Sequence, residues 1–126
     1  MNENQENLLD HYVNPRNYNK KDIEIDSTVK LLNTSCGDEI NVSIKVKDNK
    51  ISDVTFTGEG CSIAIGTASI LYETLLGKDL TEILGIAHDY PETLIGIPLT
   101  ISRKKCATLP LEAIKDAIRQ YTKDNS

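Results

Sequence analysis

The chain has 126 residues, a length that suits one domain able to bury an ordinary core without disulfides. Its hydrophobic fraction of 39% and charged fraction of 26% are those of a soluble globular protein. A net charge of −5 argues against nucleic-acid binding, because phosphates need a basic face, and a partner with a basic surface is easier to accommodate.

The N-terminal residues and the cysteines indicate the cellular compartment. No run of 18 apolar residues occurs, and residues 1–6 are polar and acidic, so we expect a cytoplasmic protein with no membrane association. Three cysteines, Cys36, Cys61 and Cys106, cannot all pair within the chain. In a reducing compartment such cysteines are more often buried, catalytic or metal-bound than bridged.

The first predicted element is a short docking helix over residues 5–12. Its apolar stripe consists of Leu8, Leu9 and Tyr12, and it stops before Pro15 because the residue before a proline disfavours helix. The next segment, residues 17–26, is polar and rich in lysine, which is typical of a linker.

A three-stranded antiparallel meander is predicted next. A strand runs over residues 27–33, and after a turn the apolar residues from Ile40 to Val46 alternate strictly with polar ones. Residues 48–50 supply turn chemistry, and a third strand leads from Ile51 towards Gly58.

The pattern then becomes helical. Apolar residues at helical spacing predict a helix over residues 62–76, and Gly77 is placed to cap its C-terminus. A second helix is predicted over residues 80–88, ended by Pro91, and residues 91–99 suit either another helix or a covering loop.

The last predicted helix has a wide apolar stripe from Leu109 to about Tyr121, and we expect residues 123–126 to fray. Strands first and helices afterwards predict an α+β fold, with helices packed on one face of the three-stranded antiparallel sheet. We expect a single domain over residues 1–126, in which residues 1–26 are the N-terminal helix and linker.

The cysteines lie at element ends rather than in apolar mid-element positions. Cys36 is expected at a turn between strands, Cys61 at a strand-to-helix junction and Cys106 at a helix entry. Structural cysteines usually take apolar positions inside elements, so these positions favour one shared site. Their spacing matches no local zinc motif such as paired CxxC, and scattered buried thiols remain the alternative.

Asp38 completes the candidate ligand set. The turn Cys36-Gly37-Asp38 is able to present a thiolate and a carboxylate together, since Gly37 permits tight backbone geometry. Three sulfurs and one oxygen suit zinc, or iron in a sulfide cluster, and an aspartate ligand makes a cluster site more labile. By itself, Asp38 would be an ordinary turn aspartate.

The environments of two thiols suggest reactivity. Cys61 is expected at the start of a helix, where N–H groups stabilise a thiolate, so it suits a ligand or a nucleophile. Cys106 follows the cations of residues 103–105, which predicts a lowered pKa, although such a run is most often a solvated face. His11 is interpreted as a helix-end residue and His88 as a cap of a helix C-terminus, rather than as ligands.

Several motifs together resemble the IscU/SufU family of iron–sulfur cluster assembly scaffolds, which is related to the N-terminal domain of NifU. The similarity spans nearly the whole chain. The matching motifs are His11-Tyr12-x-Asn14-Pro15-Arg16-Asn17, Cys36-Gly37-Asp38, Gly58-x-Gly60-Cys61 with Ala64-Ile65 and Ser69, Gly77-Lys78, and Arg103-x-Lys105-Cys106-Ala107-x-Leu109.

The resemblance implies that Cys36, Asp38, Cys61 and Cys106 meet at one exposed end of the fold and bind zinc, iron or a [2Fe–2S] cluster. It also implies that a cysteine desulfurase delivers persulfide sulfur to one of these cysteines, with Cys36 and Cys106 as candidate acceptors. A downstream apo iron–sulfur protein or carrier would then be the recipient. We expect a monomer or a weak homo-oligomer.

The chain differs from both subtypes. IscU-type members carry a histidine before the third cysteine, whereas this chain has Lys105, as SufU-type members do, which assigns the fourth ligand to Asp38. The insertion usual in SufU-type members is absent, and so is the family's Leu-Pro-Pro-Val-Lys chaperone segment. The main expectation is a scaffold and sulfur acceptor that is not a turnover enzyme; the alternatives are a zinc-dependent sulfurtransferase and a zinc-bound regulator of the desulfurase.

Overall fold

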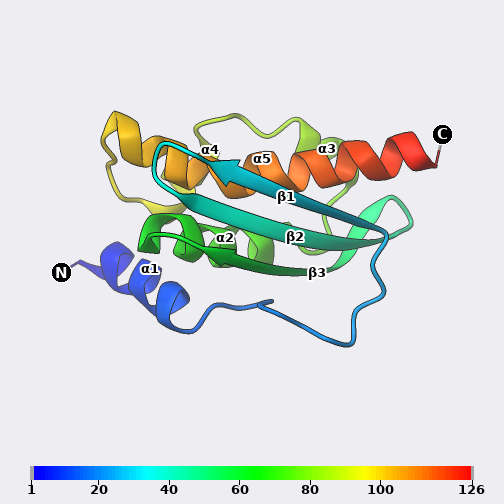
Figure 1. Cartoon of the computed structure of the whole chain (residues 1–126), viewed down its shortest axis with the longest axis horizontal. Coiled ribbons are helices and arrows are strands. Elements are labelled where there is room, and N and C mark those ends of the chain that lie inside the picture. Colours follow the sequence, from blue (N-terminus) through cyan, green and yellow to red (C-terminus); the bar gives the residue numbers. More distant parts are fainter. Residues whose placement is uncertain (1, 126) are drawn as a thin grey trace.

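The computed structural model describes residues 2–125, and it contains one sheet and five helices within that range (Figure 1). None of the helices in this part of the chain is both long and apolar enough to cross a membrane. In chain order the elements are α1 (Glu3–Val13), β1 (Ser27–Asn33), β2 (Asp38–Lys47), β3 (Lys50–Glu59), α2 (Ser62–Leu75), α3 (Leu80–Leu84), α4 (Tyr90–Ile95) and α5 (Ile101–Asp124).

The sheet is the predicted antiparallel meander, in the order β1-β2-β3. Alternate residues of β2, Ile40, Val42 and Ile44, are fully buried, as their spacing predicted. The β2–β3 turn passes through Asp48 and Asn49, whose φ angles of 54° and 60° are those of a tight hairpin turn.

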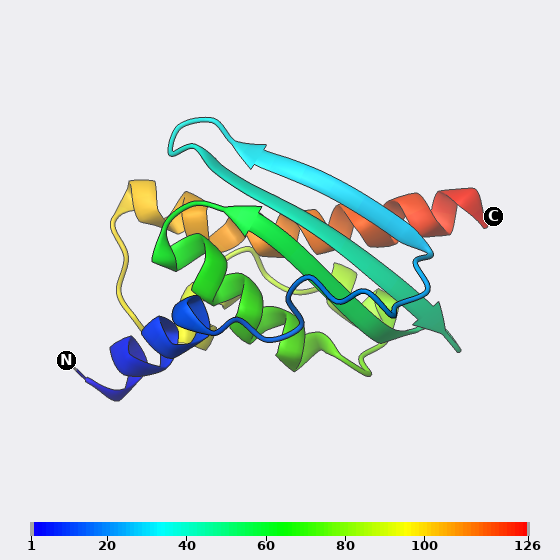
Figure 2. The same ribbon diagram turned by 60° about the horizontal axis from the view of Figure 1, so that its bottom comes forward.

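Helices α2 and α5 cover one face of this sheet, which confirms the predicted α+β arrangement (Figures 1 and 2). Strand and helix residues share one core, in which Tyr72 of α2 is completely buried and donates its hydroxyl hydrogen to the Pro110 carbonyl at 2.7 Å. The linker pairs with the free edge of β3 at Phe56, where the N–H of Asn19 donates to the Phe56 carbonyl and the N–H of Phe56 donates to the Asn17 carbonyl.

Helix α1 packs on α2, but with a different face from the one predicted (Figure 2). Of the expected stripe only Leu8 is buried, against Gly66, while Leu9 and Tyr12 are 42% and 40% exposed. The buried position on the next turn belongs to His11, whose Nδ1 lies 2.7 Å from the Ser69 hydroxyl. His11 is therefore a helix-end residue, as expected, but one that anchors the helix.

The predicted helix over residues 80–88 exists but is shorter than predicted. Helix α3 ends at Leu84 with Gly85 as its C-cap, and a new helix, α4, begins at Tyr90. Pro91 starts this helix rather than ending the one before, because a proline in the first turn loses no hydrogen bond. His88 lies in the connection and is exposed, so it does not cap a helix C-terminus.

Helix α5 begins earlier than predicted. The Thr100 side chain accepts a hydrogen bond from the Arg103 N–H and caps the helix, so Cys106 lies in the second turn rather than at the entry. The helix runs to Asp124, and Ser126 lies outside the described residues, so the fraying of residues 123–126 stays a prediction.

Candidate metal centre

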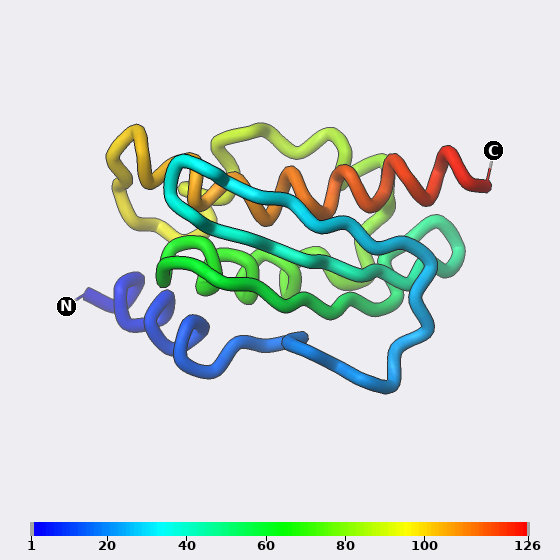
Figure 3. Tube along the Cα trace, in the orientation of Figure 1, coloured from blue at the N-terminus to red at the C-terminus, as the bar shows by residue number. Residues whose placement is uncertain are grey.

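Three chain reversals meet at one end of the molecule: the β1–β2 turn, the start of α2 and the start of α5 (Figure 3). The β1–β2 turn carries Cys36, which is exposed. The N–H groups of Cys36 and Gly37 both donate to the Asn33 carbonyl, at 3.3 and 2.9 Å. Gly37 has a φ of +72°, a conformation that favours glycine, so a glycine suits this tight turn.

Asp38 is a buried carboxylate at the first position of β2. It is 1% exposed, and its Oδ1 accepts a hydrogen bond from the Cys61 N–H at 3.2 Å. Its Oδ2 is buried and has no hydrogen-bond partner among the described residues. Buried polar atoms are nearly always paired, so this carboxylate oxygen is suited to bind a cation.

Cys61 is the N-cap of α2, as the sequence indicated, and its thiol is half-buried. Gly60 precedes it with a φ of +150°, a conformation that side chains rarely adopt. A Cβ atom at Gly60 would overlap Oδ1 of Asp38. The junction therefore needs a glycine so that the β3–α2 backbone can approach the carboxylate.

Cys106 is buried, and the expectation of a lowered pKa is wrong. Burial raises the pKa of the Cys106 thiol well above its ordinary value, and the neighbouring side chains of Asp38, Cys36 and Cys61 raise it further. Its Sγ lies 3.8 Å from the Ser102 carbonyl, as suits a protonated thiol. In the absence of a metal, Cys106 is thus a neutral thiol and not an activated nucleophile.

The cations before Cys106 do not counter this effect, because Arg103, Lys104 and Lys105 are all exposed. Lys104 forms an ion pair with Glu92 at 3.8 Å. Lys105 lines an open groove of about 310 Å³ on the side of α5, together with Leu32 and His88. The structure therefore supports the interpretation that these three side chains form a solvated face.

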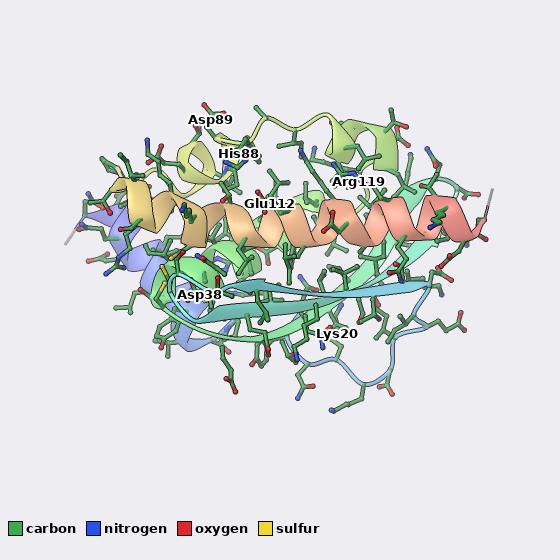
Figure 4. The ribbon with its side chains drawn as sticks, turned by 45° about the horizontal axis from the view of Figure 1, so that its top comes forward. Lys20, Asp38, His88, Asp89, Glu112 and Arg119 are labelled. Atoms are coloured by element: carbon green, nitrogen blue, oxygen red, sulfur yellow. The ribbon has the colours of Figure 1, made fainter. Side chains whose placement is uncertain are left out.

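The ligand atoms of Cys36, Asp38 and Cys106 all lie within 4.8 Å of one another. Figure 4 shows Asp38 at the end of the sheet, beneath the first half of α5. The Cys61 thiol lies outside this group, although it is near enough to raise the pKa of Cys106. Two sulfurs and one carboxylate oxygen with a third sulfur beside them form a donor set that suits zinc or iron.

The two histidines lie elsewhere. His11 is buried against Ser69, and burial, followed by the nearby Arg16 cation, lowers its pKa. The His88 Nδ1 lies 3.8 Å from a carboxylate oxygen of Glu112, on the exposed side of α5 (Figure 4). Among the described residues, neither imidazole belongs to the group formed by the thiols and Asp38.

One residue of this region was not singled out from the sequence. Asn33 pairs in register with Asp38, and its side-chain Nδ2 is buried without a hydrogen-bond partner among the described residues. The only available signal was its position as the last strand residue before the cysteine turn, which is also typical of ordinary turn asparagines.

Comparisons with known proteins show which family the chain resembles. The NifU-like N terminal domain family matches residues 3–126. "Iron-sulfur cluster assembly scaffold protein IscU 1" of Archaeoglobus fulgidus is 38% identical over 94% of this chain and 76% of its own length. "Zinc-dependent sulfurtransferase SufU" of Bacillus subtilis is 32% identical over 88% of this chain and 86% of its own.

Solved structures share the fold. A crystal structure of a hypothetical protein superposes with a TM-score of 0.78 at 28% identity, covering 92% of this chain and 96% of its own. A nitrogen-fixing NifU-like protein (N-terminal) from Brucella abortus superposes with a TM-score of 0.72 at 19% identity, covering 97% and 94%. These likenesses place the meander and its helices in a known fold.

Proposed function

The chain belongs to the NifU-like N terminal domain family, and we propose that it is an iron–sulfur cluster assembly scaffold that accepts sulfur from a cysteine desulfurase. The observation that carries this proposal is the group formed by Cys36, Asp38 and Cys106, with its buried, unpartnered carboxylate oxygen. The names of the Archaeoglobus and Bacillus relatives support it.

The proposed ligands of the metal or nascent cluster are Cys36, Asp38, Cys61 and Cys106. Cys61 is included because its thiol borders the group and its own N–H holds Asp38. The cargo is iron in a [2Fe–2S] cluster, and zinc is the ion that the same donor set holds in the absence of a cluster. A bound cation neutralises the buried charge that Asp38 and the thiolates would otherwise carry.

Cys36 is the better candidate for the first sulfur acceptor. Its thiol is exposed on a turn, whereas Cys106 is buried with a raised pKa. In the proposed transfer, the Cys36 thiolate attacks the outer sulfur of the desulfurase persulfide. A new S–S bond forms on Cys36, the old S–S bond breaks, and the desulfurase cysteine leaves as a thiolate.

Anaerobic reconstitution tests this function directly. The protein is incubated with ferrous iron, cysteine and a cysteine desulfurase, and visible absorbance and acid-labile sulfide are measured. We expect a cluster in the native protein, and a much reduced rate of assembly in Cys36→Ser. A protein that keeps zinc and never assembles a cluster under these conditions would contradict the scaffold function.

A zinc-dependent sulfurtransferase is the second candidate. It is favoured by the similarity to the Bacillus subtilis protein of that name and by Lys105, which stands where the IscU type has histidine. In this case the zinc-loaded protein would accept labelled persulfide sulfur from the desulfurase and pass it to a thiol acceptor. Sulfur transfer without any cluster formation would select this function.

A further inference from the structure

The carboxylate of Asp38 is held asymmetrically. Oδ1 accepts the hydrogen bond from the Cys61 N–H at 3.2 Å, while Oδ2 is buried with no partner among the described residues. Both oxygens belong to a side chain that is 1% exposed, so water does not compensate for this difference. One oxygen is therefore used by the protein and the other remains available.

Gly60 makes this arrangement possible. A Cβ atom there would overlap Oδ1 and would come within 3.0 Å of Cγ and 3.2 Å of Cα of Asp38. The backbone of Asp38 lies within β2 and the carboxylate is enclosed, so the neighbours cannot move aside as a flexible surface side chain would. Any side chain at Gly60 must displace the carboxylate from the Cys61 N–H.

We infer that Gly60 and the Cys61 N–H are positioning groups that fix the Asp38 carboxylate, so that it binds the metal through Oδ2 alone. This inference rests on the proposed function, since it concerns the same metal site. An outer hydrogen bond of this kind orients a ligand and sets its strength as a donor. With Oδ1 committed to the backbone, Asp38 is a single-oxygen ligand that is more easily exchanged than one binding through both oxygens.

The test measures metal binding rather than activity. Zn²⁺ affinity is determined by competition with a chromophoric chelator, and Co²⁺ is added as a spectroscopic probe of ligand geometry. We expect Gly60→Ala to lower Zn²⁺ affinity by about 10–100-fold, the usual cost of losing an outer-sphere partner, and to change the Co²⁺ ligand-field bands.

Gly77 provides a matched control for backbone strain. It has a φ of +83°, lies far from the site, and a Cβ atom there would meet nothing within 4 Å. Gly77→Ala therefore introduces strain without touching Asp38. It should keep Zn²⁺ affinity within about threefold of the native protein, below the loss expected for Gly60→Ala.

A double-mutant cycle shows whether Gly60 acts through Asp38. In an Asp38→Ala background the carboxylate is gone, so adding Gly60→Ala should change Zn²⁺ affinity by less than about twofold. An undiminished effect in that background, or native affinity in Gly60→Ala, would overturn the inference. Failure of the native protein to bind Zn²⁺ or Co²⁺ stoichiometrically would instead refute the proposed metal site itself.

Discussion

At the far end of the sheet, the β2–β3 hairpin turns through Asp48 and Asn49 and packs against the end of α2. The backbone groups there bond to one another. The Ile51 N–H donates to the Lys78 carbonyl at 3.1 Å, the Gly77 N–H to the Ile51 carbonyl at 2.8 Å, and the Leu80 N–H to the Asn49 carbonyl at 3.0 Å. This end is closed by the chain's own hydrogen bonds.

The cysteine end uses similar backbone conformations with a different result. Gly37 and Gly60 have positive φ angles, like Gly77 at the far end. Yet Oδ2 of Asp38 and Nδ2 of Asn33 are buried there without partners among the described residues, beside thiols. Tight turns alone therefore do not make a site: within residues 2–125, buried polar atoms without partners lie at the cysteine end and not at the far end.

The largest effect that separates the two ends is expected for Asp38→Ala. Loss of a ligand should lower Zn²⁺ affinity by more than about 100-fold, beyond the cost of losing an outer-sphere partner. Metal-free stability should change by no more than about 1 kcal/mol, because the lost hydrogen bond is offset by removal of an unpartnered buried oxygen. Chelator competition and urea unfolding measure the two quantities.

Lys105→Ala is the matched control for Asp38→Ala, because Lys105 adjoins Cys106 in the chain but is exposed. It should retain the metal. Equal Zn²⁺ affinity in the native protein and Asp38→Ala would show that Asp38 is not a ligand.

A substitution at the far end should lower stability and leave metal binding unchanged. Gly77→Ala places a side chain at a φ of +83°, which costs about 1 kcal/mol of unfolding free energy. The same protein should bind Zn²⁺ normally, since Gly77 is remote from the thiols. A loss of metal comparable to that in Asp38→Ala would mean that the two ends are coupled, and the contrast between them would fail.

The His11 contact links α1 to α2 and should affect folding alone. Burial lowers the pKa of His11 in the folded state, so the unfolded chain takes up its proton first as pH falls below about 6.5. The metal-free protein should therefore lose stability between pH 7.5 and pH 5.5 in the region where His11 titrates. Unfolding of His11→Gln across this range should show a smaller pH dependence; an unchanged slope would exclude His11 as the source.

The smallest effect is expected at the hairpin turn itself. Asn49 has a φ of 60°, which glycine adopts without steric cost, and a glycine there is favoured in two-residue hairpins. Asn49→Gly should change stability by less than about 0.5 kcal/mol and leave metal binding unaltered. Thermal unfolding of the metal-free protein measures the change in stability. A destabilisation above about 1 kcal/mol would show that the Asn49 side chain has a further role.

The sequence predicted correctly those strands and helix ends that depend on neighbouring residues in the chain. Strict alternation identified β2, and Gly77 correctly marked the end of α2. The errors arose where tertiary packing decided. His11 displaced Leu9 from the buried face of α1, and Pro91 began a helix instead of ending one.

Element ends and family motifs predicted that Cys36, Asp38, Cys61 and Cys106 meet. The structure places the ligand atoms of Cys36, Asp38 and Cys106 within 4.8 Å of one another and leaves the Cys61 thiol outside this group. The pKa of Cys106 was wrong because the sequence shows neighbouring cations but not that they face solvent while the sulfur is buried. The burial of Asp38 and its bond to the Cys61 N–H depend on the β2–β3 register, which no local pattern reveals.

X-ray absorption at the zinc edge of the zinc-loaded protein counts the sulfur and oxygen ligands of the metal. We expect three sulfur atoms at about 2.3 Å and one oxygen at about 2.0–2.2 Å, with the oxygen contribution lost or replaced in Asp38→Ala. A native site with a histidine nitrogen, or with fewer than three sulfurs, would contradict the ligand set of Cys36, Asp38, Cys61 and Cys106.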